Sequence, residues 1–157
     1  MEDIQTLLAI EEIRRLEARY AWHADHKQWH ELAELFTDDG WFRPLDASGN
    51  EVLCLHGRQE IGDILHGRNS GDVELVHQLF THDIVIESPT AARAVWAMAD
   101  LIFRGDSAMP QGEAGDTRVP FRTMRGWGHY HVTYRRVDGR WLISTRTLTR
   151  TRLEYTH

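Results

Sequence analysis

The sequence contains little cysteine, no excess of positive charge and no long apolar run. Cys54 is the only cysteine in 157 residues, which excludes an internal disulfide and a cysteine-based zinc site. The net charge of -6 argues against a nucleic-acid-binding protein, because phosphate recognition needs a basic surface. No apolar run is long enough to span a membrane and no secretory signal is recognisable, so we expect a cytoplasmic protein that contacts no membrane.

Motifs for nucleotide and acyl chemistry are missing as well. The chain has no phosphate-binding glycine loop, no dinucleotide-binding motif, no G-x-S-x-G elbow and no internal repeat. The rest of the composition, 41% hydrophobic and 27% charged, is typical of a folded globular protein. A single domain over residues 1–157 is therefore expected, and no cofactor is indicated.

Hydrophobic periodicity predicts three helices in the first half of the chain. Apolar residues at three- and four-residue steps indicate a helix over residues 3–24, a short helix over 29–36 and a third helix over 57–65. A strand that begins at Trp41 and a returning strand over residues 51–55 are predicted between the second and third helices.

Alternating patterns predict a sheet in the second half. The glycine-rich segment 105–118 between its two strand pairs is expected to be a mobile hairpin tip, with a lid as the alternative. The first pair occupies residues 73–103 around Ser88-Pro89-Thr90, and the second joins 125–137 to 141–153 across Asp138-Gly139.

An ionisable side chain interrupts the apolar face of each strand in the first pair. His77 alternates with Leu75 and Leu79, and Asp100 alternates with Met98 in the partner strand. A buried carboxylate is costly unless it is paired or hydrogen-bonded. We interpret the two residues as the sign of a reactive pocket.

Three further polar residues are candidates for this pocket. Arg146 shares a phase with Leu148 in the last strand, although the opposite phase is equally plausible as the inner one. Tyr20 lies in the apolar stripe of the first helix, where ordinary core packing is the alternative. Asp25 lies about 140° from Tyr20 on an ideal helix, so the two converge only if the helix ends or bends near Asp25.

Histidine spacing raises the question of a metal site. His23, His26 and His30 follow one another at steps of three and four and could share a helical face. A hydrated cluster at a helix end is the expected interpretation. His129 and His131 alternate within a strand, where a half-buried pair of histidines is expected, so no metal is predicted.

The order of these elements resembles the NTF2-like superfamily in its SnoaL-like branch. The resemblance covers residues 9–152 and implies an α+β cone, with three N-terminal helices packed on a curved antiparallel sheet. It is greatest for the group that contains bile acid 7α-dehydratase, scytalone dehydratase and hexachlorocyclohexane dehydrochlorinase. The segments that carry it are EEIRRLEARYAWHADHKQWHELAELF, GRQEIGDIL, VHQLFTHDIVIES, WAMAD and GHYHVTYRRVDGRWLISTRTLTR.

The resemblance also implies roles for individual residues. An aspartate after the first helix and a histidine on a central strand act as a dyad in this group, and Asp25 and His77 occupy those positions. Tyr20, Asp100 and Arg146 fall where further catalytic pocket residues lie. Arg146 could pair with Asp100 or with an acidic group of a substrate.

These roles imply a dehydratase, a carbon–oxygen lyase that works without a cofactor on an apolar, cyclic, polyketide- or steroid-like hydroxy-carbonyl compound. The resemblance further implies a homodimer or homotrimer. An isomerase, a cyclase or an epoxide hydrolase could use the same pocket. A non-catalytic ligand-binding or structural module also stays open, in which Asp100 and Arg146 form a buried ion pair and His77 is a hydrogen-bonded core residue.

Overall fold

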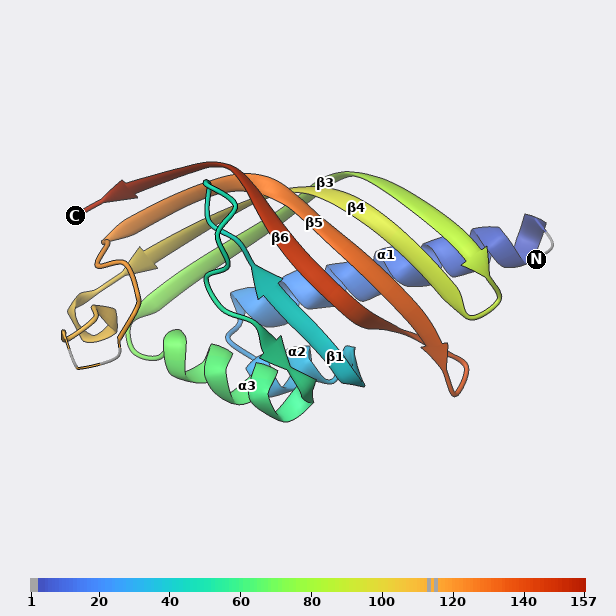
Figure 1. Cartoon of the computed structure of the whole chain (residues 1–157), viewed down its shortest axis with the longest axis horizontal. Coiled ribbons are helices and arrows are strands. Elements are labelled where there is room, and N and C mark those ends of the chain that lie inside the picture. The colour runs from blue at the N-terminus through green and yellow to red at the C-terminus, as the bar shows by residue number, and fades with distance from the viewer. Residues whose placement is uncertain (1–2, 113, 115) are drawn as a thin grey trace.

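A long helix lies under a curved sheet in the computed structural model, which describes residues 3–112, 114 and 116–157. The three helices are α1 (Asp3–Asp25), α2 (Trp29–Ala33) and α3 (Gly57–Arg68). Figure 1 shows the long strands arching over α1, with α2 and α3 at the lower edge of the view. None of the helices in the described part of the chain is long and apolar enough to cross a membrane.

The sheet has six strands in the order β2-β1-β6-β5-β4-β3. All neighbours are antiparallel except β1 and β6, which are parallel. The predicted α+β architecture, with three helices packed on a curved sheet, is confirmed, and the parallel β1–β6 pair makes this mainly antiparallel sheet a mixed one. The strands are β1 (Phe36–Pro44), β2 (Leu55–His56), β3 (Val73–Ser88), β4 (Ala91–Arg104), β5 (Thr123–Val137) and β6 (Arg140–Thr156), with a 3-10 turn, η1 (Asp106–Ala108), after β4.

Three predicted boundaries near the start of the sheet are wrong. Helix α2 ends at Ala33, and Phe36 pairs with Ile143 instead of continuing the helix. Strand β1 begins at Phe36 instead of Trp41, and a register shift between these two residues makes its first part bulged. The predicted strand over residues 51–55 is reduced to the short β2.

The hairpin between β5 and β6 is confirmed. Asp138 and Gly139 have φ angles of 50° and 79°, and positive φ at both central residues is the geometry of a type I′ turn. This turn follows the right-handed twist of the flanking strands. It sets the register that carries the inward-facing side chains of β6 to their partners on β5.

A buried ion pair crosses the core between α1 and β6. The Nη1 atom of Arg146 lies 3.0 and 2.9 Å from the two carboxylate oxygens of Glu17, and neither side chain is exposed. The hydroxyl of Tyr134 donates to the same carboxylate and accepts the indole N–H of Trp96 at 3.0 Å. Burial is the largest single effect and would lower the pKa of Arg146, but the charge of Glu17 together with the three neighbouring tyrosines outweighs it and raises this pKa.

We expect Arg146→Met to lower the free energy of unfolding by about 3–5 kcal/mol, because it leaves the Glu17 carboxylate buried and unpaired. The double variant Glu17→Leu, Arg146→Met is expected to recover part of this loss. Urea unfolding at neutral pH measures both. The control is Arg152→Met, whose pair with Glu154 is exposed and contributes under about 1 kcal/mol. A similar loss in the control and in Arg146→Met would contradict the prediction.

Candidate active site

The concave side of the sheet encloses a cavity of about 460 Å³. Its walls come from α1, α3, the long strands, the β1–β2 connection and the segment between β4 and β5. Most of the lining is apolar, which suits a ring-shaped ligand. The ionisable and phenolic groups in the middle of this wall are Tyr20, His77, Asp100, Tyr130 and Arg150.

Asp25 and His77 form a hydrogen-bonded pair at this wall. Oδ1 of Asp25 lies 2.8 Å from Nδ1 of the His77 ring and 2.8 Å from the backbone nitrogen of the same residue. The His77 side chain is 12% exposed and the Asp25 side chain 28%. When the carboxylate accepts a hydrogen bond from the Nδ1–H group of the neutral ring, the Nε2 atom carries the free lone pair.

Asp25 reaches the strand because α1 ends at this residue. The chain then turns through Lys27, which has a φ of 56°, and the Lys27 ammonium donates to the carbonyl of Val73 at 3.0 Å. This hydrogen bond connects the segment after the helix to Val73, the first residue of β3, which lies four residues before His77. The sequence left open whether the helix ends near Asp25, and its end at this residue brings the carboxylate to His77.

Asp100 lies opposite His77 on the neighbouring strand β4. Its carboxylate accepts two N–H bonds from Arg150, at 2.6 and 2.9 Å. Arg150 reaches Asp100 from β6 across β5, where Gly126 leaves room. A Cβ atom on Gly126 would overlap both Arg150 Nη1 and Asp100 Oδ1, so a side chain there would disrupt the pair.

The pair between Asp100 and Arg146, which the sequence analysis gave as one possibility, does not form, since Arg146 binds Glu17 and Arg150 binds Asp100. Both arginines share one alternation phase of β6, so alternation alone could not distinguish them. Arg150 is the pocket arginine that the sequence analysis missed. The signal that could have indicated it is Gly126 on the adjacent strand, which leaves space for a long side chain.

Arg146 instead supports two tyrosines of the cavity wall. Its guanidinium carbon lies 3.6 Å from the ring centroid of Tyr20 and 3.8 Å from that of Tyr130. Burial raises the pKa of Tyr20, and it also raises that of Tyr130. Both phenols therefore stay protonated at neutral pH and can act as hydrogen-bond donors.

The three histidines near the end of α1 have separate partners. His23 Nδ1 bonds the Gln28 side chain at 2.8 Å, and His26 Nδ1 bonds a backbone carbonyl of its own helix. His30 pairs with Asp63 at 2.9 Å. In residues 3–112, 114 and 116–157, no group of three or more His, Cys, Asp or Glu side chains is placed to hold a metal ion.

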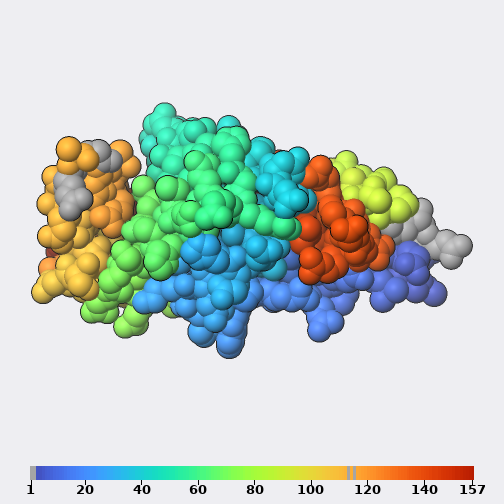
Figure 2. Space-filling model, turned by 90° about the horizontal axis from the view of Figure 1, so that it is seen from below, coloured from blue at the N-terminus to red at the C-terminus, as the bar shows by residue number. Residues whose placement is uncertain are grey.

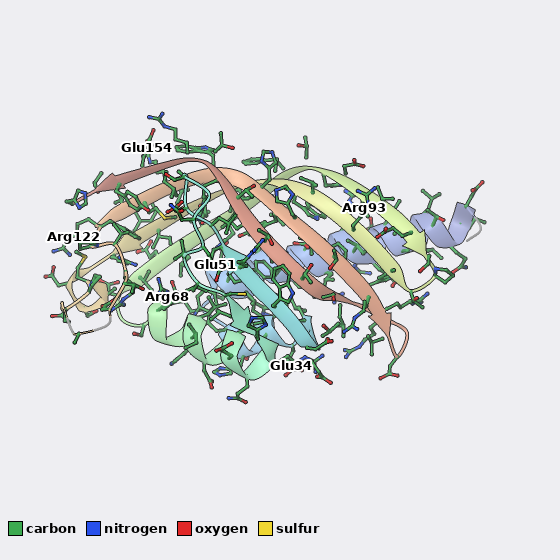
Figure 3. All side chains as sticks on the ribbon, viewed as in Figure 1. Glu34, Glu51, Arg68, Arg93, Arg122 and Glu154 are labelled. Carbon is green, nitrogen blue, oxygen red and sulfur yellow. The ribbon has the colours of Figure 1, made fainter. Side chains whose placement is uncertain are left out.

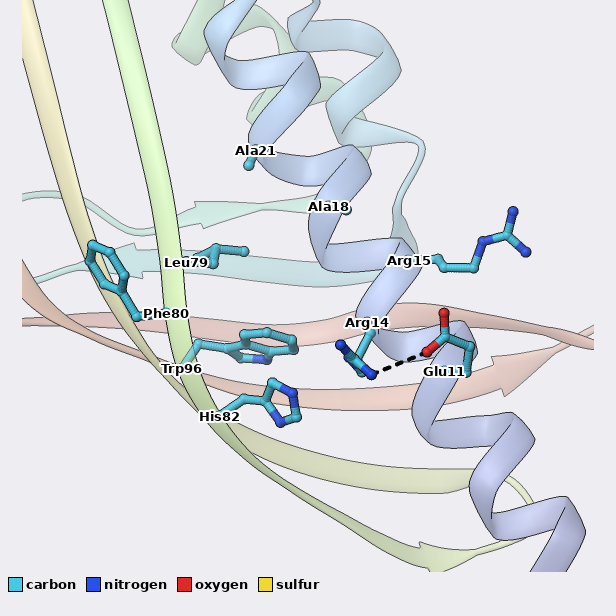
Figure 4. Close-up of a pocket in the computed structure, with 9 residues that line it drawn as sticks. All are labelled: Glu11, Arg14, Arg15, Ala18, Ala21, Leu79, Phe80, His82 and Trp96. Carbon is cyan, nitrogen blue, oxygen red and sulfur yellow. Dashed lines mark hydrogen bonds and ion pairs between the residues drawn. The ribbon is translucent and has the colours of Figure 1, made fainter.

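A second hollow lies between α1 and the β3–β4 pair. Figure 4 shows aromatic side chains of these strands facing polar side chains of the helix. His82 packs on Trp96 with ring centroids 4.6 Å apart, while Arg14 is paired with Glu11 at 3.3 Å and both are more than half exposed. This ion pair is thus hydrated, unlike the nearly buried pair of Asp100 and Arg150 in the cavity beside His77.

Sequence comparison assigns the chain to a family. A model described as the SnoaL-like domain matches residues 5–147. The chain belongs to the SnoaL-like family. The expected NTF2-like fold is confirmed by solved structures that superpose over nearly the whole SnoaL-like chain.

Three solved structures illustrate this likeness. A candidate scytalone dehydratase from Novosphingobium aromaticivorans is 22% identical, with 99% of this chain and 93% of that chain covered and a TM-score of 0.77. A hexachlorocyclohexane dehydrochlorinase, LinA type 2, is 15% identical, with 99% and 94% covered and a TM-score of 0.74. ActVI-ORFA from Streptomyces coelicolor is 18% identical, with 90% and 96% covered and a TM-score of 0.68. At these identities the likeness shows the fold.

The buried tyrosines predict a loss of stability at alkaline pH. Burial raises the pKa values of Tyr20, Tyr130 and Tyr134 above the ordinary 10.0, so the folded state keeps protons that the unfolded chain releases. The stabilisation is complete below about pH 10 and declines as the pH rises further, by up to about 1.4 kcal/mol per pH unit for each tyrosine.

Urea unfolding in steps from about pH 9 to pH 11 measures this decline. Tyr134→Phe removes one of the three groups and is expected to reduce the alkaline slope by about one third. A free energy of unfolding that stays level over this range would contradict the prediction.

Proposed function

We propose that this SnoaL-like protein is a cofactor-independent dehydratase that removes water from an apolar cyclic hydroxy-carbonyl compound. The observation that carries the proposal is the hydrogen bond between Asp25 and His77 at the wall of a largely apolar cavity. Similarity in fold to a candidate scytalone dehydratase and to a dehydrochlorinase, both named for eliminations, supports the reaction class.

In this proposal His77 is the general base. Its Nε2 takes a proton from the carbon next to the substrate carbonyl, and the ordinary pKa range of histidine suits that task near neutral pH. Asp25 holds the ring in the tautomer that leaves Nε2 free and stabilises the cation that forms. The second bond from Asp25, to the backbone N–H of His77, keeps the carboxylate fixed during the transfer.

Tyr20 supports the developing enolate. Its protonated phenol donates a hydrogen bond to the substrate carbonyl oxygen from a dry wall, where a preorganised donor has its largest effect. The electron pair of the enolate then forms the carbon–carbon double bond as the carbon–oxygen bond breaks. The His77 cation returns its proton to the departing hydroxyl, so water leaves and the base is restored.

The other polar residues position this chemistry. Asp100 accepts two bonds from Arg150 and has lone pairs left for a substrate hydroxyl. Arg146, which the resemblance places among the site residues, acts through Tyr20 by stacking on its ring. The predicted homodimer or homotrimer stays a prediction, and sedimentation of the purified protein tests it.

Substitution of the dyad tests the proposal. A panel of cyclic β-hydroxyketones is supplied, and the absorbance of the conjugated product follows turnover. We expect His77→Ala and Asp25→Asn each to lower the rate by about 10²- to 10⁴-fold, which is the usual contribution of a general base. The matched control is His129→Ala on an exposed position of β5, which is expected to keep the rate.

Deuterium exchange and thermal unfolding separate this proposal from the alternatives. Exchange of the proton next to the carbonyl without loss of water would favour an isomerase. A His77→Ala variant that loses stability while the wild-type protein turns over no compound of the panel would instead favour a structural or ligand-binding module. Product formation that survives His77→Ala would rule out this residue as the base.

A further inference from the structure

One end of the cavity is lined by arginines. Arg68 comes from the end of α3, Arg104 from the end of β4 and Arg118 from the segment between β4 and β5. Figure 2 shows this segment, in orange, beside the last part of α3, in green, and Figure 3 labels Arg68 at this end of the helix. The cluster lies in a protein whose net charge is -6, so its positive charge is local.

Arg68 and Arg104 are partly buried, and neither forms an ion pair with a carboxylate in the part of the chain that the structure describes. The side chain of Arg68 makes no hydrogen bond with any described residue. Arg104 donates to the carbonyl of Val119 at 2.8 Å and stacks on the ring of Phe121, and both of these partners are uncharged. The remaining member of the cluster, Arg118, binds Asp116 at 2.7 Å.

Asp116 relieves only part of the repulsion within the cluster. Burial lowers the pKa of Arg68, the nearby charge of Arg118 lowers it further, and the charge of Asp116 raises it and so offsets part of this shift. Burial, then Arg118 and then Arg68, lowers the pKa of Arg104, and Asp116 again acts in the opposite direction. Like charges in a partly dry site repel each other, and a bound anion relieves that repulsion.

The strand register fixes how far the cluster lies from the dyad. Asp100, opposite His77, and Arg104 are four residues apart on β4 and share its inner face. At about 3.3 Å per residue, Asp100 and Arg104 are separated by about 13 Å along the strand. Between Asp100 and Arg104, Ile102 pairs with Leu75 of β3, and both of these apolar side chains line the cavity. The wall therefore runs from a polar centre through an apolar belt to a cationic end.

We propose that this cationic end binds a carboxylate of the ligand, and that the ligand is an elongated apolar acid. The planar guanidinium groups of Arg68 and Arg104 match a carboxylate in shape and charge. The proposed function enters this proposal only through the reacting group of the ligand, which would face His77 about 13 Å from the arginines along the strand. A phosphate monoester shares the same anionic chemistry, but its second negative charge is disfavoured by Asp116 beside the cluster.

Binding of two matched probes tests this assignment. The probes are 1-pyrenebutyrate and 1-pyrenebutanol, which share a flat apolar ring system and differ in charge. Isothermal titration at low salt is expected to show at least about tenfold tighter binding of the acid, as a charge-assisted hydrogen bond gives. In the double variant Arg68→Gln, Arg104→Gln the two affinities are expected to agree within about twofold.

The control is Arg125→Gln, which removes the same charge from an exposed position of β5 and is expected to keep the preference for the acid. Equal affinities in the wild-type protein, or a preference that survives in the double variant, would overturn the proposal. Displacement of pyrenebutyrate by inorganic phosphate but not by acetate at the same concentration would overturn the carboxylate assignment.

His77→Ala separates this proposal from the proposed function. The variant is expected to keep the preference for the acid over the alcohol, whatever its effect on the two affinities themselves, because the arginine end lies apart from His77. Loss of turnover and loss of charge preference are thus read from different variants. Circular dichroism of the double variant verifies that it is folded before its affinities are compared.

Discussion

The ion pair between Glu17 and Arg146 joins α1 to β6 in the driest part of the core. Removing either partner leaves a buried charge, so the helix and the strand are held together by a contact that tolerates little displacement. The same guanidinium lies between the rings of Tyr20 and Tyr130, which form part of the cavity wall. The position of α1 against the sheet, and hence the position of Asp25 at its end, depends on this contact.

The hydrogen-bonded pair of Asp25 and His77 is a contact between two layers of the fold. Asp25 belongs to the helix and His77 to an inner face of the sheet, and a single carboxylate oxygen binds both the ring and the backbone of the histidine. The orientation of the imidazole is therefore set by the pleat of β3 as well as by the carboxylate. A site of this kind requires the assembled fold, because neither layer contains both groups.

Alternation in the sequence was sufficient to place His77 and Asp100 on the inner face, because polar residues in an apolar phase need partners. It could not distinguish Arg146 from Arg150, since both lie in one phase and the choice depends on a glycine in the neighbouring strand. Helix periodicity also failed at Phe36, where pairing with β6 overrides the local apolar pattern. The helices, the long strands and the hairpin turn depend mainly on local signals, so the sequence predicted them well.

Gly126 limits how this sequence can diverge. The Asp100–Arg150 pair occupies the space that any side chain at this position would need, and it does so from two different strands. Positions 100, 126 and 150 are therefore sterically coupled, and the smallest residue is as restricted as the two charged ones. A relative that gains a side chain at the glycine position must lose or rebuild the pair, and with it the polar centre of its cavity.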